Sequence, residues 1–196
     1  MKFLFKLLVV LLFLDLSAQT LPASTTFVDQ NFQVNYHVVN NNLQIEFILQ
    51  NGMNGWMTVV FNTFPFPADS IVAWWDPETN QALVWDAYNP GIPTLPSFPS
   101  PLQDTDPTLN IPNGAPNDNQ NNVKIIYASN QNGIIDIILQ RPLITRDILD
   151  IQLETGGQYR VNLMYNPHNG FINTYDAVQP GYPMGAVSKS AIWYLN

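Results

Sequence analysis

The sequence predicts an all-β fold, an antiparallel, immunoglobulin-like β-sandwich of about nine strands with a long Pro- and Asn-rich loop. Stretches in which apolar and polar residues alternate recur along the chain, and helical periodicity is nearly absent beyond the first residues. Asn, Gly and Pro separate these stretches, as they do in turns between short strands. The chain has no Cys, so packing rather than disulfides must stabilise the sandwich.

The first two expected strands form a hairpin. Apolar and polar residues alternate along Phe32–Val39 and again along Leu43–Leu49, which predicts two half-buried strands. Asn40-Asn41-Asn42 supplies the turn between them. Asn51-Gly52, a dipeptide that accepts positive φ, closes the hairpin.

The later strands are shorter and less regular. Trp56–Phe61 is apolar on both faces, and Asp76-Pro77 ends the strand that follows it. The strands expected after Trp56–Phe61 are Ser70–Trp75, Ala82–Tyr88, Val123–Ser129, Ile134–Gln140, Tyr159–Tyr165 and Ala186–Leu195. Between two of them, the stretch Asn89–Asn122 carries many Pro residues and a polar run, so an irregular excursion over one end of the sandwich is expected there.

Residues 1–18 are expected to be a secretory signal peptide. Lys2 and Lys6 precede the apolar run Leu7–Leu14, and Ser17-Ala18 offers small residues for cleavage after Ala18. The run is shorter than the roughly 20 residues that a membrane span needs, so no span is expected after cleavage. The remaining residues, Gln19–Asn196, have the size of one domain, and a secreted, extracellular protein is expected.

The charge of the chain limits its partners. The formal net charge is −8 and only 11% of the residues are charged. Such a surface repels phosphates, so nucleic acids and anionic membranes are excluded as partners. Many amides with few charges suit proteins that bind neutral polar ligands or pack against each other, and a compositional bias of the source explains them equally well.

Two stretches carry a family resemblance. An apolar strand ends in the turn Arg141-Pro142-Leu143-Ile144-Thr145-Arg146-Asp147, and Asp150 follows shortly after. Earlier, Gly55-Trp56 opens one strand, Ala68-Asp69 opens the next, and Asp86 and Tyr88 end a third. These stretches resemble the late and early parts of the DOMON domain, a family of secreted β-sandwiches that bind haem or sugars. The resemblance implies a DOMON-like sandwich and an extracellular ligand-binding or interaction module.

The resemblance also implies where a b-type haem would find its axial ligands. The family's Met position falls on Pro65, which offers no sulfur. The nearest match to the family's His position is Met184, and His168 in a neighbouring loop is the alternative. His168 and Met184 are therefore the candidate axial ligands, and haem b is the candidate cofactor.

Aromatic residues form the candidate site for a sugar or another neutral ligand. Aromatic rings stack on flat ligands, and nearby amides supply hydrogen bonds. Trp74 and Trp75 are adjacent in one strand and must face opposite sides of its sheet. The alternative is that these rings fill the space of a cofactor. The candidate residues are Trp56, Phe64, Phe66, Trp74, Trp75 and Trp85.

The acidic residues are expected to be structural. Asp69, Arg141, Asp147 and Asp150 belong to the resembling motifs, with Arg141 pairing with an acid across the sandwich and Asp147 bracing the turn after Thr145. No catalytic triad, phosphate loop or metal-binding motif occurs, so neither catalysis nor a metal site is expected. The expected function is a secreted, non-catalytic module for a sugar or neutral ligand. The alternatives are a haem electron carrier and a structural or adhesive subunit that self-associates through its sheet edges.

Overall fold

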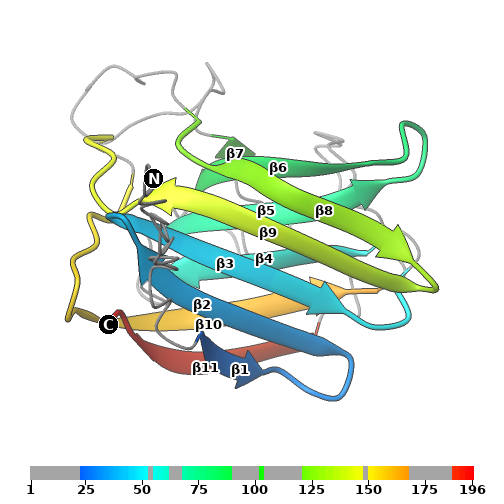
Figure 1. The fold of residues 1–196 in the computed structure, drawn as a ribbon, viewed down its shortest axis with the longest axis horizontal. Helices are drawn as coiled ribbons and strands as arrows, with labels where there is room; N and C mark the ends of the chain where they lie inside the picture. Colours follow the sequence, from blue (N-terminus) through cyan, green and yellow to red (C-terminus); the bar gives the residue numbers. More distant parts are fainter. Residues whose placement is uncertain are drawn as a thin grey trace, which may run out of the picture.

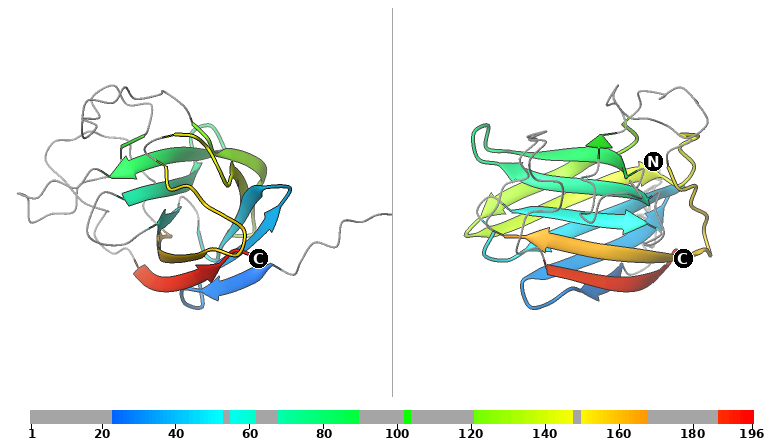
Figure 2. Two further views of the ribbon diagram at one scale, coloured as in Figure 1. Left: turned by 90° about the vertical axis from the view of Figure 1, so that its left-hand side faces the viewer. Right: turned by 180° about the vertical axis from the view of Figure 1, so that it is seen from behind.

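Two antiparallel β-sheets pack face to face in the computed structural model (Figures 1 and 2). The structure describes residues 23–52, 55–61, 68–89, 102–103, 121–147, 150–167 and 187–196. These residues form eleven strands, so the prediction of an all-β antiparallel sandwich is confirmed. Within the same residues, no helix is long and apolar enough to cross a bilayer.

The strands of sheet A follow the order β1-β2-β3-β9-β8, and those of sheet B the order β11-β10-β4-β5-β6-β7. In sheet A the bounds are β1 Ser24–Phe27, β2 Phe32–Val39, β3 Asn42–Leu49, β8 Lys124–Gln131 and β9 Ile134–Pro142. In sheet B they are β4 Trp56–Phe61, β5 Ala68–Asp76, β6 Gln81–Asn89, β7 Leu102–Gln103, β10 Gln158–Asn166 and β11 Val187–Tyr194. Each sheet thus joins hairpins to a strand from later in the chain, β9 beside β3 and β10 beside β4.

Two strands were not expected from the sequence. β1 is a short edge strand that pairs with β2, and β7 pairs with the end of β6 at the other sheet's edge. β7 lies inside the stretch that the sequence predicts to be irregular, so that prediction is wrong for Leu102–Gln103. A strand of this length shows no periodicity that could set it apart from the Pro-rich residues around it.

The hairpin turns use the residues that their geometry requires. Asn40 and Asn41 both have positive φ, 49° and 60°, between the paired residues Val39 and Asn42. Asn tolerates the left-handed region better than most residues, and a two-residue hairpin loop with positive φ at both positions matches the twist of the strands. These turns fix the register, and the register decides which side chains enter the interior.

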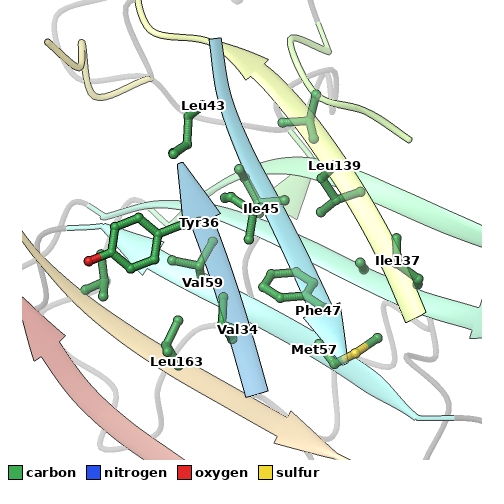
Figure 3. Packing of buried hydrophobic residues seen from close by; sticks show 14 of the residues in the cluster. Val34, Tyr36, Leu43, Ile45, Phe47, Met57, Val59, Ile137, Leu139 and Leu163 are labelled. Atoms are coloured by element: carbon green, nitrogen blue, oxygen red, sulfur yellow. The ribbon is translucent and has the colours of Figure 1, made fainter. Parts of the chain in front are cut away.

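The inner faces of the two sheets form the hydrophobic core. Sheet A contributes alternate residues of β2, β3 and β9, which meet inward-facing residues of β4 and β10 (Figure 3). Tyr36 of sheet A stacks on Trp193 of sheet B, with ring centroids 4.2 Å apart and planes tilted by 13°. The residues labelled in Figure 3 are Val34, Tyr36, Leu43, Ile45, Phe47, Met57, Val59, Ile137, Leu139 and Leu163.

Gly55 packs closely against Leu49 of the β2–β3 hairpin and against the end of β10. A Cβ at Gly55 would overlap with the Leu49 side chain and lie 2.9 Å from the carbonyl oxygen of Asn166 and 3.1 Å from Cα of Pro167. Two of these three neighbours are backbone atoms, which cannot rotate away. The sequence therefore needs glycine at the entry to β4.

Gly55→Ala is expected to lower the free energy of unfolding by about 1–3 kcal/mol, because the added methyl group overpacks this junction. Urea denaturation followed by tryptophan fluorescence measures the loss. Gly156→Ala is the comparison for backbone strain, because its Cβ would meet nothing within 4 Å while φ is 83°. The packing argument fails if Gly55→Ala leaves the free energy of unfolding unchanged.

Candidate functional site

The outer face of sheet B carries an apolar surface that we call the tryptophan face. Along β4 the side chains of Met57 and Val59 point into the core. Because side chains alternate in a strand, Trp56, Thr58 and Val60 point to the opposite side of the sheet. The described members of the tryptophan face are Trp56, Thr58, Val60, Val72, Trp74, Trp85, Ala87 and Met164.

The strand register brings the tryptophans together. Trp56 of β4 pairs with Trp74 of β5, and Val72 of β5 pairs with Trp85 of β6. Side chains of paired residues share one face of a sheet, so these three indoles lie side by side or diagonally. The rings of Trp74 and Trp85 meet edge to face, with centroids 5.3 Å apart and planes at 82°. The planes of the two indoles are therefore nearly perpendicular, so one ring presents its face where the other presents its edge.

Along the row in which Leu83 pairs with Trp74 and Trp74 with Trp56, exposure falls from β6 toward β4. On this face Leu83 of β6 is 38% exposed, Trp74 of β5 is 7% exposed and Trp56 of β4 is fully buried. Trp85 is partly buried. The described members of the apolar cluster come only from β4, β5, β6 and β10 of the one sheet. The described part of the face is thus most open at Leu83 and Trp85 of β6, and Trp56 of β4 is enclosed.

Thr58 lies at the enclosed centre of the tryptophan face. Its cross-strand partners are Met164 on β10 and Val72 on β5, and its neighbours on the same side of β4 are Trp56 and Val60. The side chain is fully buried, and its hydroxyl Oγ1 has no hydrogen-bond partner among the described residues. A buried hydroxyl without a partner is uncommon, because it loses its hydrogen bonds to water without replacement.

The sequence-predicted aromatic residues separate into three groups. Trp56, Trp74 and Trp85 meet on the tryptophan face. Trp75 points the other way, into the core, where its Nε1 donates to Oδ1 of Asn80 at 3.3 Å. This opposition of Trp74 and Trp75 is the one that the strand period predicts. Phe64 and Phe66 lie outside the described residues.

Thr58 and Met164 belong to the face, but the sequence analysis does not single them out. The signal that could have found Thr58 is that β4 is apolar on both sides, which leaves no solvent-facing side for its one hydroxyl. Met164 is harder to find, since only the pairing of β10 with β4 places it opposite Thr58. That pairing joins residues about a hundred positions apart, which no local pattern shows.

The predicted haem ligands His168 and Met184 lie outside the described residues. The described part of the tryptophan face supplies one thioether, Met164, and no imidazole. A b-type haem takes its axial ligands from groups of this kind. The described part of the tryptophan face alone therefore does not provide a haem-ligating pair, and haem binding stays a prediction from the resemblance.

A second buried feature joins the two sheets at one end of the sandwich. Arg141 of β9 is fully buried, and its Nη1 donates to Oδ2 of Asp69 on β5 at 2.8 Å. Its Nη2 lies 3.2 Å from Oδ2 of Asp150 and donates to the carbonyl oxygen of Ile151 at 2.8 Å. The Ile151 backbone N–H in turn donates to Oδ2 of Asp69. The sequence-based expectation that Arg141 pairs with an acid across the sandwich agrees with this geometry.

Asp86 of β6 completes this buried cluster. Its Oδ2 accepts a hydrogen bond from the backbone N–H of Asn122 at 2.8 Å. Burial, and then repulsion from Asp150, raises the pKa of Asp86 to about 8. Burial alone would lower the pKa of Arg141, but Asp69, Asp150 and Asp86 outweigh it and hold that pKa above its ordinary value. Arg141 is therefore charged, and Asp86 holds a proton at neutral pH.

The turn between Arg141 and Asp150 is braced by Gln152. Its Oε1 accepts from the backbone N–H groups of Thr145 and Arg146, and its Nε2 donates to the carbonyl oxygens of Asp147 and Asp150. Thr145 Oγ1 also accepts from the Asp147 backbone N–H at 3.2 Å. The sequence predicts that Asp147 braces this turn; its carboxylate Oδ2 accepts a hydrogen bond from Nδ2 of Asn122 at 3.5 Å. Gln152 was not singled out.

Asp69, Asp86 and Asp150 are the described acidic residues close enough to share a metal ion. One carboxylate oxygen of each lies within 4.8 Å of the others. The Arg141 guanidinium already contacts Asp69 and Asp150 from within this cluster and supplies positive charge there. The arrangement is therefore explained as a buried ion-pair network that links the sheets, without a metal.

A comparison with protein families identifies the architecture. The family model of the DOMON domain matches residues 28–166, which include the tryptophan face and the Arg141 cluster. No curated protein sequence matches the chain. The residue motifs, the β-sandwich and the family match thus all indicate a DOMON domain.

Arg141→Met is expected to lower the free energy of unfolding by about 3–5 kcal/mol, because it leaves several carboxyl groups buried without their cation. Chemical denaturation measures the loss. Arg160→Met on the exposed part of β10 is the control and should change stability by less than about 0.5 kcal/mol. Additivity of Arg141→Met with Asp69→Asn in the double variant would contradict a direct coupling of the two residues.

Asp86→Asn is expected to flatten the pH dependence of stability. Because the folded-state pKa of about 8 exceeds the ordinary value of 3.8, unfolding releases a proton between these two values. The native state therefore loses stability as pH rises toward 8 and is favoured most below about pH 4. Thermal unfolding at about pH 5 and about pH 8 tests this for both proteins.

In Asp86→Asn, the new side-chain amide keeps an acceptor oxygen for the Asn122 N–H and does not need to bind a proton. This variant should therefore be more stable than the parent protein near pH 8. Asp76→Asn is the control, since hydrogen bonds from Thr79 and Glu78 lower the pKa of Asp76. This control should leave the fall in stability toward alkaline pH intact. An equally steep fall in Asp86→Asn would show that another group takes up the proton.

Proposed function

Since the chain belongs to the DOMON domain family, an extracellular type of ligand-binding or interaction module, we propose that it binds a small neutral ligand on the tryptophan face. The observation that carries this proposal is the gathering of Trp56, Trp74 and Trp85 on the outer side of sheet B. An outward sheet face normally meets water with polar side chains. Three indoles there form the kind of apolar floor on which flat ligands stack.

The chemistry of the face favours a neutral ligand. Its described members carry no charged side chain, so an ionic ligand would find no counter-charge on this floor. The edge-to-face arrangement of Trp74 and Trp85 presents one ring plane and one ring edge, which suits a flat ring lying in the corner between them. The role is binding rather than catalysis, and a secreted protein is the setting in which we place it.

The difference in exposure across the tryptophan face indicates from which side a ligand would enter. Leu83 and Trp85 are the most open members of this region, on β6, and Trp56 on β4 is the most enclosed. A ligand would therefore enter over β6 and stack against Trp85 and Trp74 before reaching β4. Trp85 is the residue to change first, because its partial exposure makes its loss less harmful to the fold.

Trp85→Ala is expected to weaken binding of a neutral ring ligand by about tenfold, because the ligand loses one stacking surface. Isothermal titration calorimetry with a panel of neutral sugars and uncharged aromatic compounds provides the measurement. Tyr194→Ala is the matched control, because Tyr194 is a 53% exposed aromatic residue on the far strand β11 of the same sheet. Equal losses in both variants, or a panel without any binder, would refute the proposal.

A further inference from the structure

The buried hydroxyl of Thr58 indicates which class of ligand would bind the tryptophan face, provided that the proposed function holds. We propose that the Thr58 hydroxyl is the polar anchor of the site, and that the ligand is a flat, mostly apolar ring compound with one hydroxyl or carbonyl group. The observation is the fully buried Oγ1 of Thr58, which has no hydrogen-bond partner among the described residues. A ligand group that pairs with this hydroxyl would supply the missing bond.

The surroundings of Thr58 exclude a partner from the neighbouring positions of the sheet. Met164, Val72, Trp56 and Val60 occupy the two cross-strand and the two same-strand positions next to it. None of their side chains offers an acceptor oxygen. The nearest hydroxyl on the same face, that of Ser70, already donates to the carbonyl oxygen of Ala87 at 3.0 Å. The Thr58 hydroxyl thus lies among apolar side chains and has no hydrogen-bond partner among the described residues.

The apolar surroundings of Thr58 select against sugars. A sugar ring carries several hydroxyl groups, and each one that is buried without a partner weakens binding. On the described face, amide side chains occur on β10, at Asn162 beside Val60 and Asn166 beside Trp56, and on β6 at Gln81. A ring compound with one hydroxyl or carbonyl group leaves nothing unpaired once it meets Thr58. The geometry therefore favours such a compound over a sugar.

The experiment compares two probes of one shape, 2-naphthol and naphthalene. Methyl-labelled methionine reports the place of binding, because the Met164 methyl lies on the tryptophan face and the Met57 methyl lies in the core. In the parent protein, both probes should shift the Met164 signal and leave that of Met57 in place. 2-Naphthol should bind about five- to tenfold more tightly than naphthalene, because only its hydroxyl group pairs with Thr58.

Thr58→Val replaces the hydroxyl by a methyl group of nearly the same shape and keeps a β-branched residue in the strand. It should reduce the preference for 2-naphthol to less than about twofold while naphthalene still binds. Thr58→Ser keeps the hydroxyl and should keep the preference. A purely structural hydroxyl would change stability in Thr58→Val but leave the preference between the probes unchanged.

The outcomes separate the two proposals. Equal binding of both probes by the parent, or an unchanged preference in Thr58→Val, overturns the role of Thr58 while the tryptophan face remains a binding site. Failure of both probes to shift the Met164 signal, together with no Trp85-dependent binding of neutral sugars, overturns the binding site itself and the role of Thr58 with it. Tight binding of neutral sugars that depends on Trp85, with no binding of either probe, overturns the ligand class.

Discussion

The structure depends on the ion pair between Arg141 and Asp69, which joins sheet A to sheet B inside the sandwich. Both side chains are buried, and the same guanidinium also contacts Asp150 from the connection between β9 and β10. A buried charge is tolerated only where partners surround it, so these groups must stay together once the sandwich has formed. One guanidinium cannot balance three carboxylates, and the proton on Asp86 reduces the excess negative charge.

This anchor has a consequence for the outer face of sheet B. Asp69 sits on β5 and pairs with Phe61 of β4, so fixing it also fixes the alternation along both strands. A slip of one residue would move Trp75 out of the core and Trp74 into it. The network at one end of the sandwich therefore determines that Trp56, Thr58 and Trp74 face outward. Their outward position in turn creates the proposed site.

The fold could be predicted from the sequence because its signals are local. Alternation along Phe32–Val39 and the Asn-rich turn after it need only neighbouring residues, and both are found in the structure. The pairing of β10 with β4 and of β9 with β3 depends on residues far apart in the chain. The partners of Arg141 and the position of Met164 opposite Thr58 follow from that pairing, so the sequence alone could name Arg141 as a pairing residue but could not assemble its cluster.

The domain contains two kinds of buried polar group, the charged cluster around Arg141, which links the sheets, and the Thr58 hydroxyl on the tryptophan face. The polar groups around Arg141 offset much of one another's charge, because a cation, carboxylates and a bound proton lie within one cluster. The Thr58 hydroxyl has only apolar neighbours at the adjacent sheet positions, and a valine of the same shape would avoid the cost of burying it. A buried hydroxyl that lowers stability and has no partner among the described residues fits the proposal that its partner is a ligand from outside the chain. The tryptophan face is the place where such a partner would reach it.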